Sequence, residues 1–307
     1  MKLELAWTKA VTYRGTYWRT GRGQDQLFYK EGSTVSRING GVTRFEPEGI
    51  VGNNSDGVAI VSGGMDSTTL VYYLRAVHGA APHLLSFDYG QRHRKELAFA
   101  LKTAEELGLR WSLIDLSSIT DLISNSALTS PPQPERWEGN VHVSRIEVPE
   151  GHYAKDNMSI TVVPNRNMMM LSIAAAVAVN AGYKYVAAGM HAGDHDVYPD
   201  CRPEFLSSTW QTMMLANRGF IDPNFELLAP FADKTKNDIA EWAYKLSVPL
   251  HETWSCYKGG DIHCGRCGTC VERLEAVASV EVAPSDWDQT RYADTTFWKA
   301  AVASASS

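Results

Sequence analysis

From residue 57 onward the sequence alternates short apolar runs with amphipathic segments, and this alternation limits what the chain can fold into. The run VAIV at 58–61 is continuous and apolar, as in a parallel strand covered on both faces. The segment STTLVYYLRAVHG at 67–79 has helical periodicity and ends on glycine. The pattern continues with predicted strands over 83–90, 110–116 and 184–190 and predicted helices over 94–109, 167–182 and 233–247. We therefore predict an α/β fold with a doubly wound parallel sheet.

Other segments differ in character and divide the chain. Residues 1–55 are rich in aromatic and β-branched side chains with turn signals between them, which predicts a β-rich extension of short antiparallel strands. The α/β domain is expected over 56–250, a metal-binding segment over 251–275, and a helix with a frayed tail over 276–307. Within the domain, residues 124–160 form a long proline-containing connection, which is typical of a binding loop or lid.

Composition narrows the class of protein. A hydrophobic content of 44% suits a packed core, and the net charge of −6 gives no general affinity for nucleic acid. The apolar run LSIAAAVAVNAG is shorter than the about 20 residues that cross a bilayer, and it is expected to be a buried helix. The first residues offer no signal-peptide core. We predict a cytoplasmic location.

The stretch SGGMDST at 62–68 lies between the first strand and helix of the α/β pattern. It lacks the lysine of the common phosphate loop G-x-x-x-x-G-K-[ST]. Backbone N–H groups of Gly63, Gly64 and the first helical turn can nevertheless converge on an anion, because the glycines allow close approach. The alternative is a Gly-Gly turn with a capping serine or aspartate.

Two lysines fall at the start of a later predicted helix, in the stretch FADKTKNDIAEWA. A cation at a helix N-terminus is unfavourable, so an anionic partner would explain Lys234 and Lys236. We select Lys234 as the catalytic candidate. The alternative is an exposed lysine beside Asp233.

Four of the five cysteines cluster as C-x7-C-x2-C-x2-C, while Cys201 stands apart. Clustered thiolates in a reducing compartment predict a structural zinc ion bound by four sulfurs, and an iron–sulfur cluster is the alternative. The glycines that follow two of the ligands, Gly265 and Gly268, permit the turns. The predicted metal ligands are Cys256, Cys264, Cys267 and Cys270.

The stretch SGGMDST resembles the S-G-G-x-D-S signature of the PP-loop ATP pyrophosphatases. This resemblance implies that the loop holds the β,γ-pyrophosphate of ATP while AMP is transferred to the substrate. The hydroxyls of Ser62, Ser67 and Thr68 would bind the pyrophosphate. Asp66 is negatively charged, as phosphate is, and would therefore not bind phosphate directly. It would instead orient the loop or bind Mg²⁺.

Four more stretches, FDYGQRHRKE, VPNRN, GDHDVYPDCRPEF and ETWSCYKGG, extend the resemblance. Together with the loop and the cysteines they resemble the 7-cyano-7-deazaguanine synthase (QueC) family, over residues 57 to about 275. The resemblance implies that 7-carboxy-7-deazaguanine is adenylated, converted to an amide by free ammonia, adenylated again and released as the nitrile. It also makes a homodimer plausible.

Within these stretches we assign substrate contacts by chemistry. A carboxylate can accept the N–H donors of a deazaguanine edge, an arginine can bind the substrate carboxylate, and a tyrosine can stack on the ring. Asp88 and Gln91 follow a strand, where open parallel sheets bind ligands, so Asp88 is assigned to the nucleotide. For the stretch FDYGQRH the alternative is a strand end with a solvated turn, and for YPDCRPEF the alternative is a surface loop. The substrate candidates are Tyr89, Gln91, Arg166, Asp194, Tyr198, Asp200, Arg202 and Glu204.

Three other functions remain open at this point. Residues 1–55 exceed what nitrile synthesis requires and are interpreted as an interface or a lid. The alternative is that they recruit a macromolecule whose amine replaces ammonia, or the reaction could stop at the amide. A transfer-RNA thiolase would need a sulfur-carrying cysteine, for which only Cys201 remains. A noncatalytic zinc-bearing binding module would not depend on Asp66.

Overall fold

The computed structural model describes residues 18–19, 26–27, 34–38, 41–47, 55–129, 136–138, 141–143, 146–153 and 158–305. Seven strands form one sheet in the order β11-β10-β5-β6-β7-β4-β3. The five strands from β11 to β7 run parallel, whereas β4 and β3 are antiparallel to their neighbours. The strands are β3 Thr34–Ile38, β4 Val42–Glu46, β5 Val58–Ile60, β6 His83–Asp88, β7 Trp111–Asp115, β10 Tyr185–Ala187 and β11 Glu226–Leu228.

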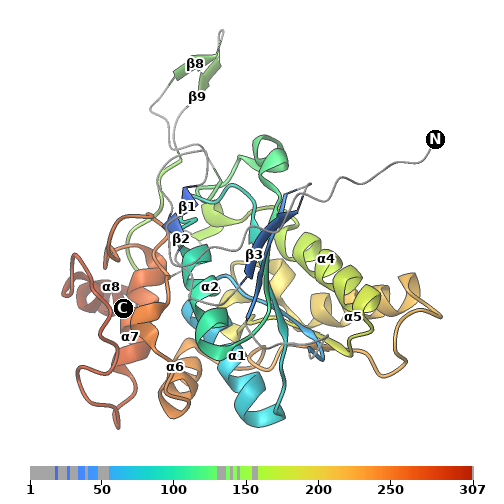
Figure 1. Ribbon diagram of the computed structural model, residues 1–307. Helices are drawn as coiled ribbons and strands as arrows, with labels where there is room; N and C mark the ends of the chain where they lie inside the picture. Colours follow the sequence, from blue (N-terminus) through green and yellow to red (C-terminus); the bar gives the residue numbers. More distant parts are fainter. Residues whose placement is uncertain are drawn as a thin grey trace.

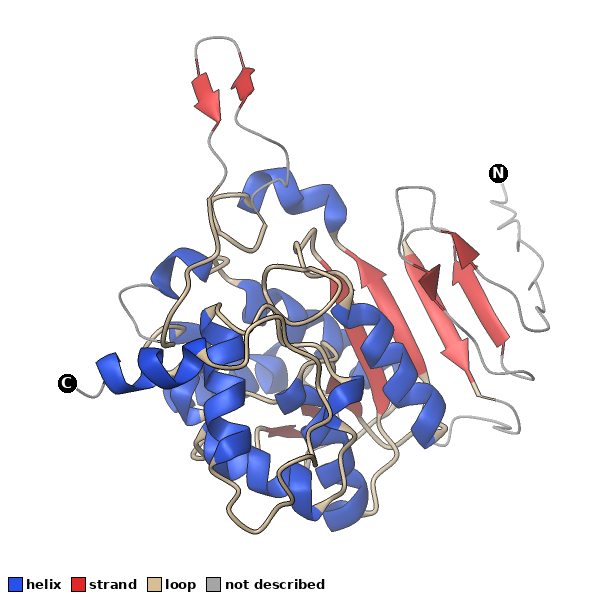
Figure 2. Cartoon of the chain, turned by 90° about the vertical axis from the view of Figure 1, so that its left-hand side faces the viewer, coloured by secondary structure: helices blue, strands red, loops and turns tan. Residues whose placement is uncertain are grey.

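Helices cover both faces of this sheet (Figures 1 and 2). On one face, α1, α2 and α6 enclose a core with the sheet, and on the other face α4 and α5 enclose a second core. The helices are α1 Met65–His78, α2 Glu96–Leu107, α4 Arg166–Ala181, α5 Pro203–Ala216, α6 Lys236–Lys245, α7 Gly268–Ala278 and α8 Phe297–Ala305. The prediction of a doubly wound α/β fold is therefore confirmed.

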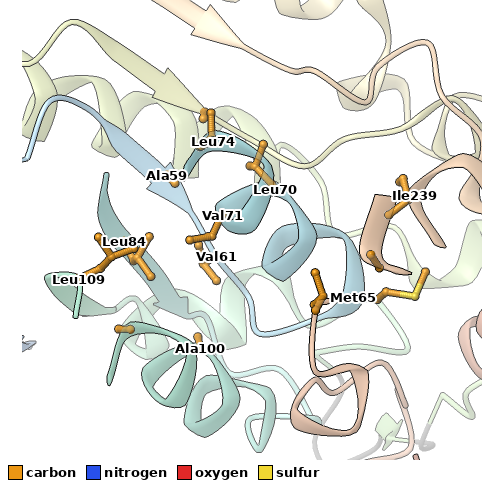
Figure 3. Packing of buried hydrophobic residues seen from close by; sticks show 14 of the residues in the cluster. Ala59, Val61, Met65, Leu70, Val71, Leu74, Leu84, Ala100, Leu109 and Ile239 are labelled. Carbon is orange, nitrogen blue, oxygen red and sulfur yellow. The ribbon is translucent and has the colours of Figure 1, made fainter. Parts of the chain in front are cut away.

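The core of the first face explains why these segments fold as they do. Leu70, Val71 and Leu74 lie on one side of α1, as a period of 3.6 residues requires, and each is at most 1% exposed. They pack over the sheet residues Ala59 and Leu84 (Figure 3). Burial of apolar surface contributes about 25 cal/mol per Å², so this stripe of α1 holds the helix against the sheet.

The strand order places the functional end of the sheet. The chain moves from β5 through β6 to β7 in one direction and then returns to β10 and β11 on the other side of β5. The gap between the carboxyl ends of β5 and β10 is therefore the point where the winding reverses. Ligands of open α/β sheets bind at such a point.

Two strands of the N-terminal extension, β3 and β4, join the main sheet and pair with each other as a hairpin. A shorter hairpin pairs β1 Trp18–Arg19 with β2 Gln26–Leu27 in a separate sheet. In addition, β4 pairs with β7 in the register Phe45 to Trp111. Phe45 is 1% exposed and belongs to the core of the first face. The antiparallel strands agree with the sequence prediction, while the proposed division at residues 55, 250 and 275 stays a prediction.

Phe45→Ala is expected to lower the free energy of unfolding by about 3–5 kcal/mol, because it leaves a cavity where β4 meets β7. Urea unfolding of the full chain measures this. The neighbouring variant Arg44→Ala is the control, since Arg44 is exposed on the same strand and its loss should change stability by less than about 0.5 kcal/mol. Equal stability of the two variants would contradict the docking of β4.

By length and composition alone, Ser159–Ala181 is apolar enough to cross a membrane, with a mean hydropathy of 1.3. Its α-helix is shorter, however, because α4 begins at Arg166 after Asn165, which has a left-handed φ of 60°. Within α4, Leu171, Ala174 and Ala178 are fully buried against the sheet and α5. The segment is a core helix of the α/β fold, as the sequence predicted.

The sequence did not predict the helices α5 and α7 or the strand β11. The stretch that starts α5 was assigned to substrate contacts, with a surface loop as the alternative, and Pro203 in the first turn of the helix is a helix-start signal that favours neither. Within residues 124–160, described parts of the predicted lid include the hairpin of β8 Arg136–Glu138 and β9 Val141–Val143. This hairpin projects from the body of the molecule (Figures 1 and 2).

Candidate functional site

A large pocket lies at the carboxyl ends of β5, β6 and β10, where the winding of the sheet reverses. Its empty space is about 1230 Å³, including the part open to solvent. The pocket is therefore a concave site at the position where open α/β sheets bind their ligands. The lining comes from the loop after β5, the end of β6, the start of α4, the segment after β10, the start of α6 and the metal-binding segment.

The loop between β5 and α1 forms one wall. Gly63 has a φ of +90°, and a Cβ there would lie 2.1 Å from the backbone oxygen of Glu96. Only glycine fits such a position without moving α2. The backbone oxygen of Gly63 accepts a hydrogen bond from the N–H of Trp254 at 2.8 Å. The loop is thus held from two sides, by α2 and by the metal-binding segment.

Donor groups gather at the end of this loop. The hydroxyl oxygens of Ser62 and Ser67 lie 3.1 Å apart, and the N–H of Gly64 donates to the Ser62 hydroxyl at 3.3 Å. The first N–H groups of α1 have no partner within the helix and carry its positive dipole end. Ser62, Gly64, Asp66 and Ser67 line the pocket, so the predicted anion site faces the cavity. Gly63 and Thr68 lie behind it, Thr68 being 1% exposed.

Lys236 is the cation of this wall. Its Nζ lies 2.7 Å from Oδ2 of Asp66 and 3.3 Å from Oε2 of Glu272, and its side chain is 14% exposed. Burial alone would lower the pKa of Lys236, but the two carboxylates outweigh it and raise that pKa. Burial alone would raise the pKa of Asp66, but the charge and hydrogen bond of Lys236 outweigh burial, so the pKa of Asp66 is lowered. Both groups are charged at neutral pH.

Lys234, the lysine selected from the sequence, lies elsewhere. Its Nζ pairs with Asp233 at 2.9 Å on an exposed surface, and it is absent from the pocket lining. The start of α6 explains the difference. Thr235 is the N-cap, its hydroxyl accepting from the N–H of Asp238, so that Lys236 becomes the first helical residue and turns inward. The structure thus brings Lys236, and not Lys234, to the site.

Two tyrosines flank an arginine in another part of the lining. The Arg166 guanidinium lies 6.0 Å from the ring of Tyr89 and 5.6 Å from that of Tyr198, within cation–π range. All three line the pocket, and their role in substrate contacts stays a prediction. Burial raises the pKa of Tyr89 to about 12, so its hydroxyl stays protonated. This part of the lining therefore offers a cation, flat rings and hydroxyl donors.

Asp194 also lines the pocket. Its Oδ2 lies 3.6 Å from Nε2 of His191, and its Oδ1 accepts from the Tyr153 hydroxyl at 3.4 Å. The N–H of Gly193 donates to Nδ1 of His191 at 3.1 Å, so the proton of a neutral His191 is on Nε2 and faces Asp194. Of the three carboxylates predicted to contact the substrate, Asp194, Asp200 and Glu204, Asp194 is the one that lines the pocket.

Other predicted residues lie outside the lining and support it. Asp88 is buried and paired with Arg94, and burial raises its pKa. Gln91 accepts from the N–H of Tyr89 at 2.9 Å and donates to Oε1 of Glu96 at 3.3 Å. Both residues shape the turn after β6 and do not reach the cavity directly.

The acidic stretch before α5 behaves in the same way. Oδ2 of Asp200 accepts from the backbone N–H of Asn167 at 3.0 Å, in the first turn of α4. Arg202 donates from Nε to the backbone oxygen of His195 at 2.7 Å. Glu204 is exposed in the first turn of α5. Their roles in substrate binding stay predictions, and the structure brings none of the three to the pocket lining.

Several lining residues were not singled out from the sequence. They share no local pattern, because tertiary packing brings them together from separate segments. His93 and Glu96 lie in the stretch FDYGQRHRKE, for which the sequence predicted contacts only from Asp88, Tyr89 and Gln91. The polar or aromatic lining residues without a predicted role are Phe87, His93, Glu96, Tyr153, Asn167, His191, Trp254, Ser255, Tyr257, Thr269 and Glu272.

The four clustered cysteines converge as predicted. Their sulfur atoms all lie within 4.8 Å of one another, and Sγ of Cys264 is 3.8 Å from Sγ of Cys270. A tetrahedral ion with bonds of about 2.3 Å places its sulfur ligands about 3.8 Å apart. Backbone N–H groups of Arg266 and Cys267 donate to Sγ of Cys264, as is common around a thiolate ligand. The donor set and spacing fit a metal ion.

The turns of the cluster differ from one another. Gly265 has a φ of +74°, and a Cβ there would lie 1.8 Å from the backbone oxygen of Asp294, so glycine is required. Gly268 has no positive φ and instead begins α7, where a Cβ would approach the sulfur of Met158 at 2.8 Å. Helix α7 carries Glu272 into the pocket, so the cysteine cluster and the cavity share one element.

A glycine-lined anion site without a phosphate-loop lysine, on a doubly wound sheet, defines a nucleotide-binding α/β protein of the PP-loop type. The family model described as queuosine biosynthesis protein QueC matches residues 56–281. The chain belongs to the QueC family. The extension before residue 56 lies outside the matched region.

Relatives agree with this assignment. The chain is 48% identical over 246 residues to the 7-cyano-7-deazaguanine synthase of Ruegeria sp. (strain TM1040), covering 80% of this chain and 97% of that one. It is 44% identical, with the same coverage, to that of Paracoccus denitrificans (strain Pd 1222). This chain is therefore an enzyme of the 7-cyano-7-deazaguanine synthase kind. The NMN synthetase of Francisella tularensis aligns with a TM-score of 0.37 and 16% identity over 67% of this chain and 69% of that one, a likeness too weak to bear on function.

Proposed function

We propose that this enzyme uses ATP to adenylate 7-carboxy-7-deazaguanine, converts it with ammonia to the amide, and dehydrates the amide through a second adenylation. One observation carries the proposal: a lysine-free phosphate loop and an arginine flanked by tyrosines line one and the same cavity. ATP and a flat, anionic heterocycle can then lie with the α-phosphorus next to the substrate carboxylate. Holding both reactants in this way is worth several kcal/mol of the barrier.

The proposal assigns a role to each group of lining residues. Main-chain N–H groups and the hydroxyls of Ser62 and Ser67 hold the two outer phosphates, while Lys236 stabilises the charge that develops on the phosphates during adenylation. Arg166 holds the substrate carboxylate, and Tyr89 or Tyr198 stacks on the ring. Asp194 accepts the N–H donors of the heterocycle.

Metal ions have two separate places in the proposal. The four cysteines hold a structural zinc ion, which closes its coordination shell and stays out of the chemistry. Mg²⁺ accompanies ATP, and Oδ1 of Asp66, which is buried and has no hydrogen-bond partner within the described part of the chain, is its candidate protein ligand. Cys201 lies in the pocket wall at 3% exposure, and burial raises its thiol pKa, which disfavours a thiolation route through a persulfide.

A product assay tests the proposal. The full chain is incubated with 7-carboxy-7-deazaguanine, ATP, Mg²⁺ and ammonia, and the products are read by mass spectrometry. We expect the nitrile, with two AMP and two pyrophosphate released per molecule. Accumulation of the amide, or its replacement by a conjugate when a macromolecular amine is added, would redirect the proposal to the corresponding product. Release of ADP and orthophosphate would contradict it.

Assembly and location stay expectations of the same proposal. We expect a homodimer in the cytoplasm, and a possible macromolecular partner would use residues 1–55. Light scattering of the purified chain measures the oligomeric state.

A further inference from the structure

Two buried polar side chains of the pocket have no part in the reaction described so far. His93 is 3% exposed and Glu96 is 7% exposed, and both line the cavity. Nδ1 of His93 is buried and has no hydrogen-bond partner among the described residues. Burying a ring nitrogen without a partner costs free energy, so a ligand that supplies the partner would explain it.

The two side chains are held in a chain of contacts. Nε2 of His93 lies 3.5 Å from Oε2 of Glu96, whose Oε1 accepts from Nε2 of Gln91 at 3.3 Å. Gln91 is fixed in turn, because its Nε2 also donates to the backbone oxygen of Phe87 at 3.0 Å. A fixed carboxylate behind an imidazole orients the ring and leaves the other nitrogen free to take a proton.

His93 and Glu96 share one cavity with the two ligand sites. The backbone oxygen of Glu96 abuts Gly63 of the phosphate loop, where a Cβ would lie 2.1 Å away. Both side chains line the same pocket as Arg166, whose charge acts on both of them. In the proposed function the reacting carbon lies between the phosphate loop and Arg166, in the cavity that these two side chains line.

The proposed reaction releases protons from nitrogen at two stages. Attack of ammonia on the acyl adenylate forms a C–N bond, breaks the C–O bond to AMP and releases one proton. Attack of the amide oxygen on ATP then forms an O–P bond and releases pyrophosphate. Cleavage of the C–O bond to AMP completes the nitrile and releases two more protons from its nitrogen. The first adenylation, by contrast, starts from an ionised carboxylate and needs no base.

We propose that His93 and Glu96 form the proton relay for these nitrogen-bound protons, with Nδ1 of His93 as the atom that takes them. His93 then passes the proton on its Nε2 to the Glu96 carboxylate. Before the next transfer the ring gives its Nδ1 proton to water in the open cavity and regains the Nε2 proton from Glu96, which restores the neutral ring and the carboxylate. This inference rests on the proposed function, since it assigns the base of the same reaction.

The environment favours such a transfer. Burial lowers the pKa of His93 to about 3, with a smaller contribution from Arg166, so the ring is neutral and can accept a proton. Burial raises the pKa of Glu96 to about 8, so the protonated acid formed by the relay is the form that burial favours. The pair takes up a proton without creating a buried charge. The other titratable group placed against His93 is Tyr257, whose ring centre is 4.9 Å away.

The test separates the step that needs a base from the step that does not. The full chain is given the amide of 7-carboxy-7-deazaguanine with ATP, and nitrile is measured by mass spectrometry. His93→Gln is expected to lower nitrile formation by about 10²- to 10⁴-fold. In the same variant, ATP–pyrophosphate exchange with the carboxylic acid should stay within an order of magnitude of wild type, because that step needs no base.

Glu96→Gln is the second variant and keeps the shape of the side chain. With the amide as substrate, ammonia does not enter, so the wild-type rate should rise as Glu96 ionises around pH 8 and then level off. Glu96→Gln should lose this rise. A wild-type nitrile rate in His93→Gln, or a parallel loss of exchange and nitrile in that variant, overturns the relay and leaves the proposed function standing. If the wild-type enzyme releases no AMP with the carboxylic acid or with the amide, both the relay and the proposed function are overturned.

Discussion

Lys236→Ala is expected to reduce ATP–pyrophosphate exchange by on the order of 10³-fold, comparable with the loss of a preorganised group that stabilises transition-state charge. Lys236 is the cation that the structure places beside the phosphate loop, where its Nζ contacts Asp66 at 2.7 Å. Its removal also leaves two carboxylates, Asp66 and Glu272, facing the phosphates without compensation. Exchange of labelled pyrophosphate into ATP, with the carboxylic acid as substrate, measures the effect.

Lys234→Ala provides the matched control. It removes the same charge two positions away, from a lysine that is 39% exposed and pairs with Asp233. A surface pair of this kind contributes little, so exchange should stay near the wild-type rate. Lys236→Arg keeps the charge and should recover part of the activity if charge is the cause. If Lys234→Ala were the more damaging variant, the assignment of the catalytic cation to α6 would have to be reversed.

Loss of the metal is expected to have the second large effect. Cys267→Ser removes one sulfur from the buried cluster, and we expect it to lose the bound metal and to expose the segment from residue 251 onward to proteases. Structural zinc contributes on the order of 10 kcal/mol in small zinc-binding peptides, so a large loss of stability is expected if the four cysteines hold such an ion. Metal analysis, thermal unfolding and limited proteolysis measure the three consequences.

Activity should fall with the metal even though the cluster is not part of the reaction. Trp254, Tyr257 and Glu272 all line the pocket, and all three belong to the segment that the cysteines hold together. Cys201→Ala is the control for metal content and should keep it, because Cys201 lies outside the cluster. Unchanged metal content and stability in Cys267→Ser would contradict a four-cysteine site. Visible absorption would indicate an iron–sulfur cluster in place of zinc.

Much of the fold follows from local pattern. Strands β5, β6, β7 and β10 and helices α1, α2, α4 and α6 lie where apolar runs and periodicity predict them. The missed helix α5 starts at a proline and carries only three buried residues, so its pattern is weak. The pairing of β4 with β7 could not be predicted, because no local signal determines which strands become neighbours.

The same distinction between local pattern and tertiary packing separates the site residues that could be predicted from those that could not. Residues that act through their own backbone turn or spacing, such as the Gly63 loop and the cysteine cluster, were predicted from the sequence. Residues that act through their position in space were not: Glu272 and His191 come from different segments and meet only in the folded chain. The choice between Lys234 and Lys236 depended on a single hydrogen-bonded cap at Thr235, which decides which side chain faces inward.

By itself, then, the sequence determined the α/β class, the glycine loop after β5, the clustering of four cysteines and the family, because each depends on residue type at short spacing. Only the tertiary structure decided which lysine lies beside the glycine loop, that Asp88 and Asp200 support the walls from outside the cavity, and that β3 and β4 extend the sheet. The physical reason is that burial and charge pairing are set by neighbours distant along the chain, and short-range pattern carries no record of them.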